Sequence, residues 1–339
     1  MKILAIDIGA GTQDIMVYDS EKGFDNAYKL VLPSPTRIFA DEVRRCKEDV
    51  VIFGDTMGGG PFTHAVLDHL KNYNVYMTES AARTIRDDLE SVKNLGVEII
   101  TDEEFEELSE KAAPIKISDF NLQLLPTLAS FGVDTAFDVI AIAVQDHGVA
   151  PQGVTDRENR FRLIEEKLGS GVESFAYLDT VPENLSRMRS IYLAVKRWFD
   201  GNLLLMDTGP AAILGSLEDD QVKGKQKAVC INVGNAHTIA MSVDEGQIAG
   251  VFEHHTYLLD KPKLENYIKK LSDGTITFQE VFDDGGHGAV VKSENQPEII
   301  SLTGPRRVAM KGLGVFAAPA GDMMMTGPVG LIKAVQSLL

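Results

Sequence analysis

The segment Asp7-Ile8-Gly9-Ala10-Gly11-Thr12 decides the fold class, because it joins two apolar segments, residues 2–8 and 14–19, that both read as β-strands. Gly9 and Gly11 allow a tight turn and let backbone N–H groups approach an anion, and Thr12 adds a hydroxyl donor. Asp7 can hold a hydrated Mg²⁺, which prefers carboxylates and substrate oxygens. The segment predicts a hairpin that binds a phosphate–magnesium complex. The alternative is an ordinary hairpin with glycine in its turn.

Two other glycine-rich phosphate motifs do not fit this segment. A P-loop requires Gly-Lys-Ser/Thr after its glycines, and these residues are absent here. The Rossmann motif requires a helix after the glycines, whereas this segment is followed by a strand.

A second copy of the hairpin is predicted later in the chain. A shift of 225 residues places Asp7 on Asn232 and Asp19 on Asp244, and both segments read strand, tight turn, strand, polar turn. This similarity predicts a duplicated domain. The second turn, Gly234-Asn235-Ala236-His237, lacks the second glycine, and Asn232 binds Mg²⁺ less well than an aspartate would.

Length, charge and cysteine content narrow the class of protein. The chain has 339 residues, which predicts two domains. Its net charge of −17 argues against nucleic acid and anionic membranes as partners. With only Cys46 and Cys230, neither a disulfide framework nor a four-thiolate metal site is expected. No apolar stretch is long enough to span a membrane, so the expected location is cytoplasmic.

The segment from Asp7 to Ile15 resembles the phosphate motif of the superfamily that contains sugar kinases, heat-shock chaperones and actin. Four further segments resemble motifs of that superfamily in the same order. They are Asp207 to Gly215 (first connecting helix), Ala228 to Val243 (second phosphate hairpin), Ile300 to Arg307 (adenosine motif) and Ala320 to Gly330 (second connecting helix). The resemblance implies an α/β protein with the two-lobed, duplicated ribonuclease-H-like fold of actin-like ATPases. It implies mixed five-stranded sheets with flanking helices, and ATP and Mg²⁺ as cofactors.

The resemblance also implies a domain organisation. The first lobe is expected to comprise residues 1–220, with residues 25–130 as an elaboration, together with a returning C-terminal helix at 320–339. The second lobe is expected at residues 221–319.

The chain further resembles a family of archaeal and bacterial proteins described as pyruvate formate-lyase activating enzymes. That description implies a radical iron–sulfur enzyme, which needs three clustered cysteines. Because the chain has only two cysteines, far apart, we do not expect this activity.

The superfamily motifs imply a set of nucleotide-binding residues. Asp7 would hold Mg²⁺ through water, and Gly304 and Arg306 would lie near the adenosine. Pro305 replaces a glycine of the adenosine motif and removes one N–H donor. The residues expected to bind the phosphates are Gly9, Ala10, Gly11, Thr12, Gly234 and Asn235.

Two segments are candidates for binding an acceptor. Gln145-Asp146-His147-Gly148 follows a predicted strand and resembles a Gln-x-His-Gly segment beside the sugar in several sugar kinases. Asp146 would activate the acceptor hydroxyl, with Gln145 and His147 as contacts. Gly58, Gly59 and Gly60 precede a predicted helix, whose N-terminus can bind an anion. The alternatives are a polar strand end and a flexible turn.

A third candidate, Glu253-His254-His255, contains metal-binding residue types. Neighbouring residues on a strand point to opposite faces of the sheet, so these three are not expected to share an ion.

The function predicted from these motifs is ATP-dependent phosphoryl transfer or ATP hydrolysis, with a small molecule as substrate. One alternative is a nucleotide-gated binding protein with little turnover, which Asn232 favours. Another is a degenerate member that binds no nucleotide, with which Pro305 is compatible.

Overall fold

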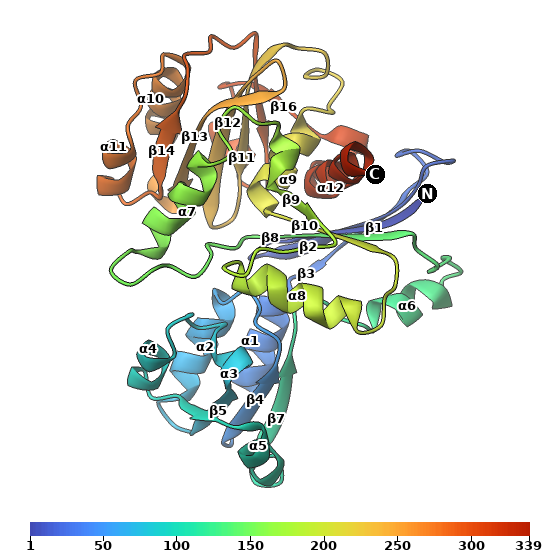
Figure 1. Cartoon of the computed structure of the whole chain (residues 1–339), viewed down its shortest axis with the longest axis vertical. Helices are drawn as coiled ribbons and strands as arrows, with labels where there is room; N and C mark the ends of the chain where they lie inside the picture. The colour runs from blue at the N-terminus through green and yellow to red at the C-terminus, as the bar shows by residue number, and fades with distance from the viewer.

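The computed structural model describes residues 1–339 and contains three β-sheets (Figure 1). The first sheet has the strand order β3-β2-β1-β8-β10-β9. Strand β1 pairs antiparallel with β2 and parallel with β8, so the predicted hairpin lies beside the centre of the sheet. The strands are β1 (Lys2–Ile8), β2 (Thr12–Asp19), β3 (Tyr28–Pro33), β8 (Val139–Val144), β9 (Ala176–Leu178) and β10 (Asn202–Met206).

The second sheet repeats this arrangement, with the order β14-β13-β12-β11-β15-β16. Strand β11 again pairs antiparallel with its hairpin partner β12 and parallel with β15. The strands are β11 (Lys227–Val233), β12 (His237–Asp244), β13 (Gln247–His255), β14 (Gly288–Val291), β15 (Ile299–Thr303) and β16 (Val315–Phe316). A shift of 225 residues superimposes β1 on β11 and β2 on β12 residue for residue, which confirms the duplication.

Five strands of each sheet correspond, and together they define the actin-like ATPase fold. Each sheet has six strands rather than the five predicted. The extra strands are short and lie at opposite ends of the two sheets: β9 pairs antiparallel with β10, and β14 pairs antiparallel with β13. Such short edge strands carry too few residues to show a strand pattern in the sequence.

A third, four-stranded parallel sheet with the order β6-β5-β4-β7 forms a separate layer below the first sheet in Figure 1. It has its own apolar core, in which Phe62, Ile52 and Met77 are fully buried. Its elements are α1 (Pro35–Arg45), β4 (Val50–Gly54), α2 (Pro61–His69), β5 (Val75–Thr78), α3 (Glu79–Ala82), α4 (Leu89–Asn94), β6 (Glu98–Ile100), α5 (Asp102–Leu108) and β7 (Ala113–Ile117).

The remaining helices connect and cover the two larger sheets. They are α6 (Leu124–Ser130), α7 (Asp156–Glu165), α8 (Ser186–Lys196), α9 (Thr208–Ser216), α10 (Lys261–Ser272), α11 (Phe278–Asp283) and α12 (Thr326–Leu338). Short 3₁₀ helices occur at Val172–Phe175, Thr256–Leu258, Arg307–Met310, Pro319–Gly321 and Met323–Met325. None of the helices combines the length and the apolar character needed to cross a membrane.

Helices α9 and α12 pack closely together between the two larger sheets (Figure 1). A Cβ atom on Gly215 would lie 1.8 Å from the backbone oxygen of Thr326, and one on Gly330 would lie 1.8 Å from that of Ala211. Glycine is therefore required at both positions, because any side chain would separate the helices. The C-terminal helix also contacts β1, so the end of the chain returns to the sheet where it began.

Candidate functional site

A cavity of about 430 Å³ lies where the three sheets meet. Its walls come from the turns after β1 and β11, from the ends of β8 and β15, and from loops of the third sheet. The predicted site residues that line it are Asp7, Gly9, Ala10, Gly11, Thr12, Gly58, Gly59, Gly60, Gln145, Asp146, His147, Gly234, Asn235 and Gly304. Arg306 is the exception: it is exposed and does not line the cavity.

The two hairpin turns have the same local structure. The N–H of Gly9 donates to the carbonyl of Thr12 at 2.9 Å, and the N–H of Gly234 donates to the carbonyl of His237 at 2.9 Å. The turns also meet each other, since a Cβ atom on Gly11 would lie 2.4 Å from Nδ2 of Asn235. Asn235 corresponds to Ala10 of the first turn under the 225-residue shift, and its longer side chain reaches across to Gly11 of that turn.

Two carboxylates stand beside the first turn. Asp7 and Asp14 are cross-strand partners on β1 and β2. Burial raises the pKa of Asp7 to about 7, and burial together with the charge of Asp7 raises the pKa of Asp14 to about 8. Asp7 accepts a hydrogen bond from the Thr208 hydroxyl, whereas Oδ1 of Asp14 is buried without any partner. A buried carboxylate oxygen with no donor is costly unless a cation or a proton satisfies it.

The predicted adenosine turn lies on the wall formed by the second sheet. Gly304 has φ +89°, and a Cβ atom there would lie 2.4 Å from Oδ1 of Asn232, so only glycine fits. Pro305 lines the cavity next to it. The N–H of Arg306 donates to the carbonyl of Val233 at 3.0 Å, which ties the turn to β11 and leaves the Arg306 side chain outside the cavity.

Asp146 is held by the backbone at the end of β8. Its Oδ1 accepts from the N–H of Gly148 and its Oδ2 from the N–H of Met188, each at 2.9 Å. Burial raises its pKa, and these two hydrogen bonds oppose the shift. Asp146 therefore anchors the first turn of α8, and each of its oxygens keeps a lone pair for another donor.

The glycine loop before α2 lines the same cavity as Asp146. A Cβ atom on Gly58 would meet the guanidinium of Arg187 at 2.7 Å. Arg187 in turn donates to Asp119 at 2.7 and 3.0 Å and to the carbonyl of Gln145 at 2.9 Å. Arg86 also lines this part of the cavity and forms no salt bridge.

A buried ion network, which sequence reasoning missed, links the two larger sheets. Arg160 on α7 donates to both oxygens of Asp207, at 2.7 and 3.2 Å, and to Oε2 of Glu253 at 2.6 Å. Asp207 follows β10 of the first sheet, whereas Glu253 belongs to β13 of the second. A single arginine in a helix with mixed charges carries no sequence signal for such a role.

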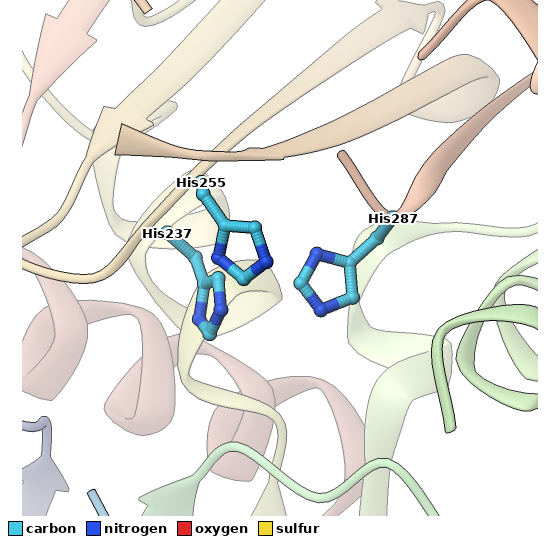
Figure 2. A group of neighbouring side chains, drawn as sticks. All are labelled: His237, His255 and His287. Carbon is cyan, nitrogen blue, oxygen red and sulfur yellow. The ribbon is translucent and has the colours of Figure 1, made fainter. Parts of the chain in front are cut away.

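Three histidines of the second sheet gather near His147, which follows β8 of the first sheet; of these four, His237 and His147 line the cavity. His237 and His255 are cross-strand partners on β12 and β13, and His287 directly precedes β14 (Figure 2). Burial lowers the pKa of His237 to about 4 and that of His287 to about 2, so both imidazoles are neutral at pH 7. His147 stacks on His287 with 5.5 Å between ring centroids.

The segment Glu253-His254-His255 alternates between faces, as strand geometry requires. His254 lies on the face opposite the cavity, where its Nε2 contacts Oδ2 of Asp284 at 3.0 Å. His255 lies with the histidines of the cavity side. The cluster combines residues 18 and 32 positions apart, counting from His237 to His255 and from His255 to His287, and no sequence spacing indicates it.

The strand order of the two larger sheets places this chain in the class of actin-like ATPase folds. Residues 57–309 match the family described as "Putative pyruvate format-lyase activating enzyme (DUF1786)", and the chain belongs to that family. No functionally curated protein matches the chain.

Several solved structures are similar at low identity. A ROK hexokinase from Thermus thermophilus is 11% identical with a TM-score of 0.35, and the alignment covers 99% of this chain and 100% of that one. A Bacteroides thetaiotaomicron protein described as having an actin-like ATPase fold and unknown function is 10% identical with a TM-score of 0.36, covering 97% and 95%. A chain of the PilM–PilN type IV pilus biogenesis complex is 13% identical with a TM-score of 0.41, covering 100% and 99%.

Proposed function

We propose that this protein binds Mg-ATP in the cavity between its lobes and transfers the terminal phosphoryl group to a small molecule or to water. The observation that carries the proposal is the meeting of the two duplicated turns at the Gly11–Asn235 contact, in a cavity that is also lined by Asp14, which has an unpartnered buried oxygen. Backbone N–H groups in such turns bind phosphate oxygens, and the carboxylate supplies what a metal–phosphate complex needs.

The residues beside the first turn fit a magnesium ion. Asp14 offers a buried oxygen that no donor in the protein satisfies, and Asp7 stands opposite it on the neighbouring strand. Asp7 and Asp14 would hold the ion through water, and the ion would neutralise charge on the phosphates. The chain's own contribution is to position the phosphates between the two turns and to exclude water as the lobes close.

The opposite end of the cavity fits an anionic acceptor. Gly58, Gly59 and Gly60 line it next to Arg86, whose guanidinium has no carboxylate partner. Asp146 lies on the neighbouring wall with free lone pairs, where it could accept a proton from an acceptor hydroxyl. The radical chemistry that the family description names is not proposed, because Cys46 follows α1 and Cys230 lies buried in β11.

A second candidate function is a nucleotide-gated switch with little turnover. Two observations favour it. Asn232 stands where Asp7 stands in the first copy, so the second turn brings no carboxylate to the metal. The Arg160 network also joins the lobes through buried charges that lobe opening would have to separate.

The test compares thermal melting with Mg-ATP, Mg-ADP and Mg²⁺ alone, using wild type, Asp14→Asn and, as a matched control, Asp25→Asn at an exposed position. A ligand present at 100 times its dissociation constant should stabilise by about 2.7 kcal/mol. Mg-ATP should raise the melting temperature of wild type and of Asp25→Asn, and Asp14→Asn should lose most of this increase. No shift in wild type with millimolar Mg-ATP would refute nucleotide binding.

ADP formation from ATP then separates the two candidate functions, because ADP is produced whether the acceptor is a small molecule or water. ADP formation that rises when small anionic acceptors are added supports phosphoryl transfer. A melting shift without measurable ADP formation, with or without acceptors, supports the switch and refutes the enzyme.

A further inference from the structure

We infer that His237, His255 and His287 form a binding site for a divalent transition-metal ion of the zinc type, distinct from the magnesium site beside Asp14. The three imidazoles each offer a ring nitrogen, and these nitrogens all lie within 4.8 Å of one another. Figure 2 shows the three rings turned toward a shared space. The inference goes beyond nucleotide binding, because the phosphate–magnesium site uses none of these side chains.

The three rings stand on rigid elements. His237 is the first residue of β12 and His255 the last residue of β13, and their ring centroids lie 4.9 Å apart. The third ring, His287, is 4.7 Å from His237 and 4.9 Å from His255 by the same measure. Ligands carried by paired strands hold their geometry better than ligands on free loops.

The backbone at His287 is fixed on both sides. Its N–H donates to the carbonyl of Glu253 at 2.9 Å, which ties it to β13. The next residue, Gly288, has φ +142°, and a Cβ atom there would lie 2.4 Å from the ring of Phe278. Only glycine fits that position, and this constraint sets the direction in which the His287 side chain leaves the chain.

The three imidazole rings have ring nitrogens without a hydrogen-bond partner in the protein, which favours a bound ion. None of the three imidazoles makes a hydrogen bond within the protein, although His287 is only 2% exposed and its Nδ1 is buried with no partner. Leaving a buried polar atom without a hydrogen-bond partner destabilises the folded protein. Simple packing of three aromatic rings would incur this cost, whereas a metal ion would remove it.

The donor set selects the kind of metal. Imidazole nitrogen suits Zn²⁺, Fe²⁺, Ni²⁺ and Cu²⁺, whereas Mg²⁺ and Ca²⁺ prefer oxygen ligands. Nitrogens bound at about 2.0–2.1 Å to a tetrahedral ion lie about 3.3 Å apart, so ring rotations that move each nitrogen by about 1 Å complete the site. Nearby charge permits a cation, because Arg160 is matched by two carboxylates, Asp207 and Glu253.

Three protein ligands leave a fourth position open, as in metal sites that bind water or a substrate. His237 lines the cavity and directly follows the second phosphate turn, at the position that corresponds to Thr12 of the first turn. The open position would therefore take water or an oxygen of a molecule bound in the cavity.

The experiment titrates chelator-treated full-length protein with Co²⁺ and Zn²⁺. Bound Co²⁺ is followed by its visible absorption, which is intense in four- or five-coordinate sites, and Zn²⁺ by calorimetry. The variants are His237→Gln and His255→Gln, whose positions are partly exposed and tolerate substitution better than His287. The matched control is His64→Gln at an exposed histidine on α2. Circular dichroism and the melting temperature without ligand report whether each variant is folded.

The expected result is one ion per chain in wild type and His64→Gln, with the absorption of a four- or five-coordinate site. Each cluster variant should bind at least about 100-fold more weakly, which is the upper end of what loss of a supporting group alone costs. Wild type that binds no Co²⁺ or Zn²⁺, or that binds them as tightly as both folded cluster variants do, would overturn the inference. So would loss of binding in His64→Gln. The Mg-ATP shift is scored separately, so failure of the metal site is distinguishable from failure of nucleotide binding.

Discussion

Replacing Arg160 by methionine tests how strongly buried charge joins the two larger sheets. Arg160 is 4% exposed, and its partners Asp207 and Glu253 are 5% and 1% exposed. Methionine keeps most of the apolar stem and removes the guanidinium. Two carboxylates then remain buried without a counter-charge. Burial alone opposes ionisation of Glu253, and Arg160 is the main group that holds the pKa of Glu253 below its ordinary value.

The expected loss follows from the cost of breaking a buried ion pair, about 3–5 kcal/mol. Unfolding entropy of about 2.1 cal/mol/K per residue gives roughly 0.7 kcal/mol/K for this chain. The melting temperature should therefore fall by about 4–7 °C. The double variant Arg160→Met, Glu253→Gln should recover part of this loss, because it leaves one unpaired buried charge rather than two.

The assay is thermal and urea unfolding of wild type, the single and double variants, and Arg44→Met as control. The Arg44–Asp41 pair is exposed, with side chains 49% and 68% accessible, so its loss should change stability by less than about 1 kcal/mol. A fall for Arg160→Met no larger than that for Arg44→Met would refute the reasoning. Failure of Glu253→Gln to recover any stability would show that the lost energy is packing and not charge.

Three further predictions concern other parts of the chain. As pH rises from about 4 to about 8, the free energy of unfolding of Asp14→Asn should increase relative to that of wild type, by up to about 1.4 kcal/mol per pH unit. Urea unfolding measures this difference, and a difference that does not change with pH would contradict the prediction. Burial raises the pKa of the Cys230 thiol to about 11, so an alkylating reagent at pH 8 should modify only Cys46 in the folded protein and both thiols in urea, as read by mass spectrometry; two adducts on the folded chain would contradict it. Gly330→Ala should lower the melting temperature by at least about 2 °C, because its Cβ would overlap the backbone of Ala211, and an unchanged value would refute the packing argument.

The sign of the Asp14 effect follows from its pKa in the two states. In the folded protein the pKa of Asp14 is about 8, and its ordinary value is 3.8. Between these values the folded state keeps the proton and the unfolded state loses it, so the stability of wild type falls as pH rises. The asparagine variant has no titrating group at this position, so its stability does not fall for this reason as pH rises. Its advantage should level off above about pH 8.

Local patterns predicted the hairpins well. The turn from Asp7 to Thr12 and its copy at Gly234 to His237 are determined by residues only a few positions apart. The sequence therefore predicted both turns, the strands beside them and the duplication. The buried strand β8 was equally visible, since it is a short apolar run followed by a polar turn that contains glycine. The third sheet was not predicted, because its strands are short and only β4 shows a clear apolar run.

The sequence alone could place the predicted binding residues in one site only through the resemblance to actin-like ATPases. Fourteen of the fifteen lie around one cavity, and Arg306 does not, because the backbone of its turn is bonded to Val233 and its side chain leaves outward. The commitment of Asp146 to two backbone amides was also invisible in the sequence, since one of its partners, Met188, lies on α8.

The order of strands, turns and helices is a property of neighbouring residues, and the chain's own pattern of apolar, glycine and polar positions therefore specifies it. The ion network of Arg160 and the cluster of His237, His255 and His287 depend instead on which strands become neighbours. Strand pairing brings together side chains that share no local pattern, and burial then decides which of them are charged, neutral or left without a partner. For that physical reason the two hairpin turns could be predicted from sequence, whereas the cluster of histidines became visible only in the tertiary structure.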